Sequence, residues 1–209
     1  MAIPDSNDLG ARLERIEAID QIRQLAAKYA IALDVRDIDA MVGLYVEDVK
    51  ATKEARGRQA LKQVLTTVLR GFTTSVHHVG NHVIEFKDRE NAEGIVYSRC
   101  EQEIEDRWIV TYLHYLDAYR KVNDRWFFRR RLVCQLYAVD MAERPAGPNK
   151  IRWPGEPAQE GNWHSSYPSW NAFWSDPRYG AAPVAPAADH DQFISTLRRG
   201  APLPKSLVL

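Results

Sequence analysis

The sequence predicts an α+β fold, in which N-terminal helices form a cone with a curved antiparallel sheet. Apolar residues recur at three- and four-residue steps at first, and from Ser75 the period changes to two. Short links between the later apolar runs indicate antiparallel neighbours. From Met141 the composition shifts toward proline and tryptophan. We therefore expect a cone domain over residues 1–140 and a long irregular C-terminal extension over residues 141–209, packed on the domain or on a neighbouring subunit.

Three helices are predicted before the sheet. The first runs from about Leu9 to Leu33, and Asp34-Val35-Arg36-Asp37 interrupts it. Asp37 can cap a short second helix, because aspartate side chains accept hydrogen bonds from a helix's first N–H groups. Gly57 opens the third helix, which ends at Gly71. The apolar sides of the three helices carry Leu9, Leu13, Ile16, Ile19, Ile22, Leu25, Ala26, Tyr29 and Leu33; Met41, Leu44 and Tyr45; and Leu61, Val64, Leu65, Val68 and Leu69.

Four long strands should follow the helices. They are expected near Val76–Lys87, Ala92–Glu105, Trp108–Val122 and Trp126–Val139, with turn signals at Asp88-Arg89-Glu90-Asn91 and Asn123-Asp124. Both faces of these strands carry apolar side chains. One face should therefore meet the helices and the other face another subunit, in a homodimer or homotrimer.

Composition limits the partners and the compartment. Lys plus Arg and Asp plus Glu both total 28, so no net charge favours nucleic acid or an anionic membrane. No apolar run approaches the roughly 20 residues of a membrane span, and no signal-peptide core follows Met1. Cys100 and Cys134 lack CxxC spacing and are typical of small buried residues in a reducing compartment. We expect a cytoplasmic protein.

The stretch from Thr73 to Phe86 holds three of the six histidines. Strand alternation sends His77, Val79, Asn81 and Val83 to one face, and His78, Gly80, His82 and Ile84 to the other. A histidine on a buried face can move protons near neutral pH. His77 and His78 compete for the inward position, since a β-bulge could reverse the parity. We prefer His77.

Three motifs resemble those of a known family. They are Tyr29-Ala30-Ile31-Ala32-Leu33-Asp34-Val35-Arg36-Asp37-Ile38-Asp39, His77-His78-Val79-Gly80-Asn81 and Asn123-Asp124-Arg125-Trp126. With the order of helices and strands, they resemble the SnoaL-like branch of the nuclear-transport-factor-two-like superfamily over roughly residues 10 to 140. Its members include scytalone dehydratases, hexachlorocyclohexane dehydrochlorinases and formaldehyde-releasing lyases of lignin-derived diarylpropanes.

The resemblance implies proton abstraction by a histidine that an aspartate orients, with no metal or organic cofactor. Matched by position, the aspartate falls on Asp34 and the histidine on His77. The sequence departs from the dehydratase pattern at Leu33 and Lys53, where that family has tyrosines. A buried carboxylate that binds one imidazole nitrogen leaves the other as a base. The alternative is that Asp34 only caps the turn.

Further site candidates come from the residues themselves. Tyr29 reaches the cavity of Asp34 only if the helix distorts near its end. His114 is either a second acid or an ordinary sheet histidine, and Arg99 either anchors a substrate or pairs with a neighbouring glutamate. His78 and His82 lie roughly 13 Å apart on a strand, too far to share one metal ion, so no metal site is expected. The predicted substrate-binding residues are Tyr45, His78, Tyr97, Arg99, Tyr112, Trp126 and Arg131.

These observations predict a cofactor-independent lyase. It would eliminate water, halide or formaldehyde from a hydrophobic aromatic small molecule such as a lignin-derived diarylpropane. Phosphate loops, Ser-centred elbows and dinucleotide fingerprints are absent from the sequence. Two alternatives stay open: a non-catalytic small subunit of an aromatic-ring dioxygenase or other ligand-binding protein, and an isomerase or polyketide cyclase.

Overall fold

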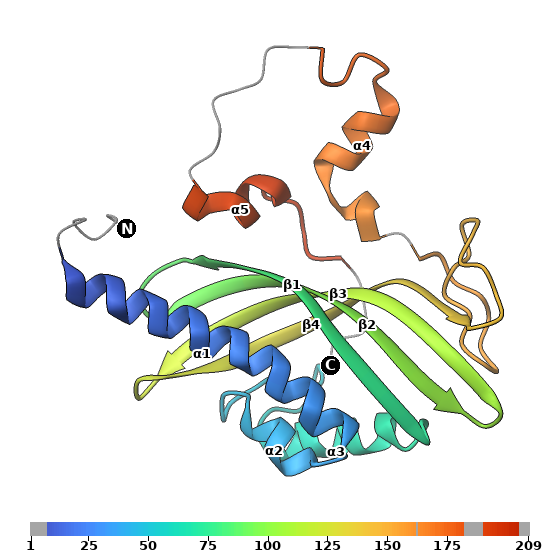
Figure 1. Cartoon of the computed structure of the whole chain (residues 1–209), viewed down its shortest axis with the longest axis horizontal. Coiled ribbons are helices and arrows are strands. Elements are labelled where there is room, and N and C mark those ends of the chain that lie inside the picture. Colours follow the sequence, from blue (N-terminus) through green and yellow to red (C-terminus); the bar gives the residue numbers. More distant parts are fainter. Residues whose placement is uncertain (1–7, 162, 182–189, 205–209) are drawn as a thin grey trace.

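The structure is a computed structural model that describes residues 8–161, 163–181 and 190–204. Helices and then a sheet follow one another as predicted: α1 (Leu9–Asp34), α2 (Ile38–Gly43), α3 (Arg58–Leu69), β1 (Thr74–Phe86), β2 (Asn91–Ile104), β3 (Arg107–Val122) and β4 (Arg125–Asp140) (Figure 1). The extension carries the short elements η1 (Trp163–Ser166), α4 (Pro168–Ser175), η2 (His190–Gln192) and α5 (Phe193–Arg198). Residues 182–189 and 205–209 of the predicted extension lie outside the described residues.

Local chemistry explains where the helices begin. The Asp8 side chain accepts a hydrogen bond from the Ala11 N–H at the start of α1. Asp37 caps α2 in the same way, with 2.9 Å between its Oδ1 and the Ala40 nitrogen, which confirms the predicted cap. Gly57 precedes α3 with a φ of 96°, a backbone conformation that favours glycine.

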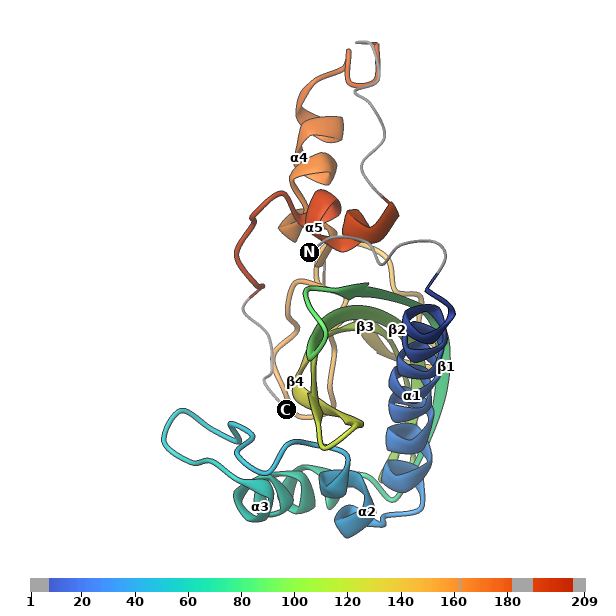
Figure 2. The same cartoon turned by 90° about the vertical axis from the view of Figure 1, so that its left-hand side faces the viewer.

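The sheet is an antiparallel meander in the order β1-β2-β3-β4. Asn123 and Asp124 join β3 to β4 with φ angles of 48° and 62°, as in the two-residue turns that match strand twist. The sheet curves, and α1 lies across its concave side (Figure 2). We call this side the inner face and the opposite side the outer face. The predicted α+β class is therefore confirmed.

Helix α1 covers the inner face with its middle and C-terminal turns. Ile22, Leu25 and Tyr29 are buried there at 0–5% exposure. The predicted apolar side was wrong near the start of the helix, since its first three members are exposed: Leu9 at 74%, Leu13 at 57% and Ile16 at 62%. These first turns extend past the strand ends in Figure 1, so the sheet cannot cover them.

The predicted alternation in β1 was wrong beyond Val79. Val79 pairs with Ser98 and His82 pairs with Val96, so Gly80 and Asn81 together oppose one residue of β2. Such a β-bulge reverses the direction of all later side chains. His82 therefore shares the inner face with His77 instead of the outer face with His78.

The outer face packs against the chain's own extension. Ile194 of α5 is 2% exposed and joins a cluster with Ile95, Leu116, Leu132 and Cys134 of the sheet. Trp163 packs edge-on against His114, with 3.9 Å between ring centroids. This face was expected to meet another subunit. The described part of the extension covers the region of the face where Ile194 and Trp163 pack. The domain division at residue 140 stays a prediction.

Among the described helices, none is long and apolar enough to span a membrane.

Replacing Trp163 with alanine should lower the free energy of unfolding by about 2 kcal/mol, because the indole fills the space over His114. Trp174 offers a matched control on the same extension, since it is 68% exposed. Its alanine variant should stay within about 0.5 kcal/mol of the parent. Urea unfolding of both variants measures the difference. Equal effects would contradict packing of Trp163 on the sheet.

Candidate active site

The carboxylate of Asp34 binds β1 at three points. Asp34 is the last residue of α1, and its Oδ1 lies 2.7 Å from Nδ1 of His77. Its Oδ2 accepts a hydrogen bond of 2.8 Å from the backbone N–H of His77. Oδ1 also accepts a bond of 2.9 Å from the Ser75 hydroxyl. Because a carboxylate only accepts, Nδ1 of His77 carries the hydrogen, and Nε2 is left for other chemistry.

Arg36 supports this arrangement from the turn after α1. Its backbone adopts a φ of 61°, which directs the chain back toward β1. Its Nη1 donates to the Ser75 hydroxyl at 2.7 Å and to the Leu33 carbonyl at 2.8 Å. Its Nη2 donates to the Phe72 carbonyl at 3.2 Å. The serine that binds Asp34 is thus itself held in place.

The environment makes His77 a strong base. Burial opposes the charged imidazolium, but the hydrogen bond to Asp34 and polar contact with Cys100 outweigh it and raise the pKa of His77 to about 9. Burial likewise opposes ionisation of Asp34, yet hydrogen bonds from His77 and Ser75 hold the pKa of this carboxyl below its usual value. The two side chains are 8% and 22% exposed. Below about pH 9 they form an ion pair, and above it the imidazole is neutral.

A buried arginine lies at the centre of the inner face. Arg131 is 0% exposed and binds Asp117 in a bidentate pair, at 2.9 Å and 2.7 Å. Its guanidinium carbon lies 4.5, 4.0 and 4.3 Å from the ring centroids of Tyr29, Tyr115 and Phe128. These contacts are cation–π interactions. The predicted residues Tyr29 and Arg131 therefore meet in one cluster.

Two polar groups of this cluster have no hydrogen-bond partner among the residues that the structure describes. They are Nη1 of Arg131 and the hydroxyl of Tyr45. Tyr45 is 1% exposed, and its ring packs 5.1 Å from that of Phe128 and 6.4 Å from that of Tyr29. Unsatisfied buried donors are costly and call for a partner. Each is a donor that an oxygen atom of a bound molecule would satisfy.

A second polar network on the inner face was missed from the sequence. Nε2 of His82 lies 3.1 Å from the Tyr119 hydroxyl, which donates to Asp117 at 2.8 Å. Burial lowers the pKa of His82 to about 4, so this histidine is neutral at physiological pH. Gly80 in the sequence could have predicted the bulge that turns His82 inward, because glycine within a strand often marks a bulge.

Five predicted site residues lie on the outer face, away from Asp34 and His77. Their cross-strand pairs place them there together: His78 opposite Arg99, Arg99 opposite Tyr112, and Tyr97 opposite His114. These residues cannot contact a substrate held against His77, because the sheet intervenes. Arg99 instead pairs with Glu101 at 3.1 Å.

His114 differs from an ordinary satisfied sheet histidine. It is 0% exposed, and neither ring nitrogen has a hydrogen-bond partner within the described part of the chain. Burial lowers the pKa of His114 to about 3, so the ring is neutral. Its prediction as a second acid beside His77 was wrong, because odd-numbered residues of β3 face inward and His114 faces outward.

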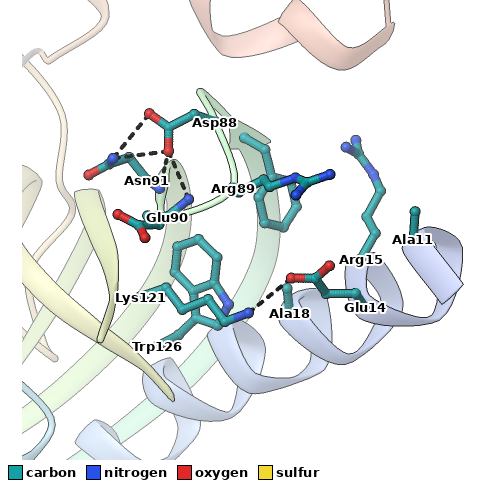
Figure 3. Close-up of a pocket in the computed structure, with 11 residues that line it drawn as sticks. Ala11, Glu14, Arg15, Ala18, Asp88, Arg89, Glu90, Asn91, Lys121 and Trp126 are labelled. Atoms are coloured by element: carbon teal, nitrogen blue, oxygen red, sulfur yellow. Dashed lines mark hydrogen bonds and ion pairs between the residues drawn. The ribbon is translucent and has the colours of Figure 1, made fainter. Parts of the chain in front are cut away.

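Trp126 lies at the opposite end of α1 from the pair. It borders a cavity of about 590 Å³ with Ala18, Arg15 and the β1–β2 turn (Figure 3). Asp34 lies sixteen positions after Ala18 in α1, which is roughly 24 Å along the helix axis. The predicted place of Trp126 in one cavity with His77 was therefore wrong.

The residues described contain no group of three or more His, Cys, Asp or Glu side chains arranged to hold a metal ion.

Comparison with known families now identifies the domain. The sequence profile of the SnoaL-like domain matches residues 14–132, which is more than half of the chain. The chain belongs to the SnoaL-like domain family. The matched range contains Asp34, His77 and Arg131, and the resemblance seen in the sequence is confirmed.

Solved structures share this SnoaL-like fold. A scytalone dehydratase-like protein of Novosphingobium aromaticivorans is 22% identical, with a TM-score of 0.55, and the match covers 70% of this chain and 99% of that one. A type 2 hexachlorocyclohexane dehydrochlorinase is 18% identical, with a TM-score of 0.59 and coverage of 69% and 99%. The type 3 dehydrochlorinase of Novosphingobium barchaimii is 18% identical, with a TM-score of 0.58 and coverage of 66% and 99%. At these identities the likeness shows the fold alone. No curated protein sequence matches.

The Asp34→Asn variant should lower the pKa of His77 from about 9, because a neutral amide cannot stabilise the imidazolium as a carboxylate does. NMR titration of the ring carbon resonances measures this change. His82 provides the control: it lies far from Asp34, and its pKa of about 4 should not move. An unaltered His77 titration would contradict the hydrogen bond between Asp34 and His77.

Acid should destabilise the protein through His114. Its pKa falls from 6.5 in the unfolded chain to about 3 in the folded one, so the unfolded state binds the proton first. The stability that neutral His114 contributes is therefore fully present above about pH 6.5, and it is lost as the pH falls toward 3. His114→Phe should lose less stability than the parent between pH 7 and pH 4 in urea titrations. An equal loss in both proteins would contradict burial of a neutral His114.

Proposed function

We propose that the chain is a cofactor-independent lyase that catalyses acid–base elimination from a hydrophobic aromatic small molecule. The observation that carries the proposal is the hydrogen bond of 2.7 Å between Asp34 and His77. A carboxylate that fixes one imidazole nitrogen leaves the other as a base of defined orientation. Structural neighbours described as dehydratase-like and as dehydrochlorinases support elimination at the level of the family.

In this mechanism, Nε2 of neutral His77 removes a proton from carbon. The electrons of the broken C–H bond form a C=C bond, and the leaving group departs with the electrons of its own bond. Asp34 stabilises the imidazolium that results. Where hydroxide leaves, it takes a proton and departs as water. Burial raises the pKa of Tyr29 to about 12, so its phenol stays protonated and can donate that proton.

Formaldehyde release follows a related course. There, His77 removes the proton of a terminal hydroxyl group, the C–C bond breaks as C=O forms, and the carbon left behind expels its own leaving group. Both courses use one base and one leaving group. They differ only in which bond supplies the electrons of the new alkene.

The inner-face cluster favours a substrate that is aromatic and carries oxygen. Tyr45, Tyr115 and Phe128 offer ring surfaces, which suit flat apolar molecules. The unpartnered Nη1 of Arg131 and hydroxyl of Tyr45 can bind a phenol or carbonyl oxygen. Hydroxylated phenolic compounds, including lignin-derived diarylpropanes, combine both features.

The test is an assay of purified, chelator-treated protein with phenolic β-hydroxy compounds that include diarylpropanediols. Ultraviolet absorbance reports a conjugated alkene, and a separate reagent reports formaldehyde. His77→Gln should lower turnover by about 10²–10⁴-fold. His114→Phe is the matched control and should stay within about twofold, because His114 faces outward.

Three outcomes would redirect the proposal. Near-parent turnover in folded His77→Gln protein would remove His77 as the base. A product with the same mass as the substrate would indicate an isomerase or cyclase. Ligands that raise the melting temperature without any turnover would indicate a binding protein, such as a dioxygenase small subunit.

The pH dependence offers an independent check. Because only neutral His77 accepts a proton and its pKa is about 9, kcat/KM should rise about tenfold per pH unit from pH 6 and level off near pH 9. In Asp34→Asn the plateau should begin at lower pH and reach a lower rate. A flat profile from pH 6 to pH 9 would exclude His77 as the general base.

A further inference from the structure

A separate cavity lies at the opposite end of α1 from Asp34 and His77. Its volume is about 590 Å³, which suits a small organic molecule. The first turns of α1 border it on one side, and the β1–β2 turn, the end of β3 and the start of β4 border it on the other (Figure 3). A small molecule held here would lie outside the candidate active site, because most of the length of α1 stands between the two places.

Aromatic side chains line the cavity where it meets the sheet. Phe86 and Trp126 pack edge to face there, with 5.7 Å between their ring centroids. Ala18 adds apolar surface from α1, and the guanidinium carbon of Arg15 lies 4.9 Å from the Phe86 centroid. Such a lining suits a flat ring, which can stack on these side chains or pack edge-on against them.

Trp126 also brings a hydrogen-bond donor that has no partner. The residue is 4% exposed, and its Nε1 is buried without a hydrogen-bond partner among the residues that the structure describes. Its backbone N–H is satisfied, since it donates to Oε1 of Gln21 at 3.1 Å. An indole N–H can only donate, and a buried donor is costly to leave unpaired. An oxygen atom of a molecule in the cavity would remove that cost.

Two arginines stand at the edge of the cavity. Figure 3 shows Arg89 extending from the β1–β2 turn toward Arg15 on α1. Arg15 already forms an ion pair with Asp191, at 2.5 Å. Arg89, by contrast, has no hydrogen-bond or ion-pair partner within the described part of the chain. Its guanidinium is therefore available to a carboxylate, which it can bind through two parallel N–H groups.

The acidic side chains around the cavity are engaged elsewhere. Glu14 pairs with Lys121 at 3.0 Å. Asp88 accepts a hydrogen bond of 2.7 Å from the backbone N–H of Glu90, within the turn itself. The carboxylate of Glu90 lies on the other side of the turn from Arg89 (Figure 3). The charge that remains at the edge of the cavity is positive, and it favours an anionic ligand.

We infer that this cavity is a second binding site, which takes small aromatic carboxylates that carry a further oxygen atom on the ring. The ring lies against Phe86 and Trp126, the carboxylate pairs with Arg89, and the ring oxygen accepts the hydrogen of Trp126 Nε1. The inference does not require the proposed elimination, because none of these residues belongs to the candidate active site.

The experiment measures binding of 4-hydroxycinnamate to the full-length protein at pH 7.5 by isothermal titration calorimetry. Arg89→Gln should raise Kd about threefold or more, because it removes the cation that faces the carboxylate. Trp126→Phe keeps an aromatic ring but removes the donor, so it should raise Kd about five- to tenfold. Cinnamate lacks the ring oxygen, and its affinity should differ by no more than about twofold between the parent and Trp126→Phe.

Controls locate the bound molecule. His77→Gln alters the inner face and Arg99→Gln the outer face, and each should leave Kd within about twofold of the parent. In ¹H–¹⁵N spectra, the indole resonance that is missing from Trp126→Phe belongs to Trp126. Added 4-hydroxycinnamate should shift this resonance in the parent protein. Melting curves establish that each variant is folded, and Arg89→Gln serves if Trp126→Phe does not fold.

Four results would overturn the inference: no binding to the parent, an unmoved Trp126 resonance, an unchanged Kd in Arg89→Gln, or a large loss of affinity in His77→Gln. The last would assign the ligand to the inner face. Failure of the proposed function is distinguishable, because this readout needs no turnover. Binding at Trp126 in a protein that catalyses no elimination would remove the lyase and retain this site.

Discussion

The hydrogen bonds of Asp34 are the constraint on which the site depends. One carboxylate ends helix α1 and accepts bonds from Ser75 and from both the backbone and the ring of His77. The same contacts thus fix the angle at which the helix meets β1 and the tautomer of the imidazole. The carboxylate that orients the base therefore also joins helix α1 to the sheet.

The sheet divides the protein into two environments that differ in their chemistry. The inner face carries the ion pair of Asp34 and His77 and the buried pair of Asp117 and Arg131. The outer face carries an aliphatic cluster, the ring contacts of Tyr112 with Tyr97 and Tyr137, and His114 beneath Trp163. The two histidines His77 and His114 show the result. Partnered by a carboxylate, one keeps its proton to about pH 9, while the other, without such a partner among the described residues, is neutral down to about pH 3.

Sequence patterns predicted what depends on local chemistry. The cap at Asp37, the turn at Asn123 and the limits of the strands follow from short-range preferences. The closeness of Asp34 and His77 followed from the family resemblance. By contrast, the bulge before His82 and the bond between Asp117 and Arg131 depend on the register between strands, which alternation within one strand does not contain. The exposed start of α1 was missed because periodicity does not reveal where a sheet ends.

The meander order of the strands has a consequence for biosynthesis. Each strand pairs with the one made just before it, so the sheet involves mainly local contacts and can assemble rapidly as the chain emerges from the ribosome. Ile194 and Trp163, which cover Leu116 and His114, are translated only afterwards. For a period of seconds the nascent chain therefore holds a finished inner face and a bare outer one. During that interval the uncovered outer face is most accessible to chaperones and to a second nascent chain on the same messenger RNA.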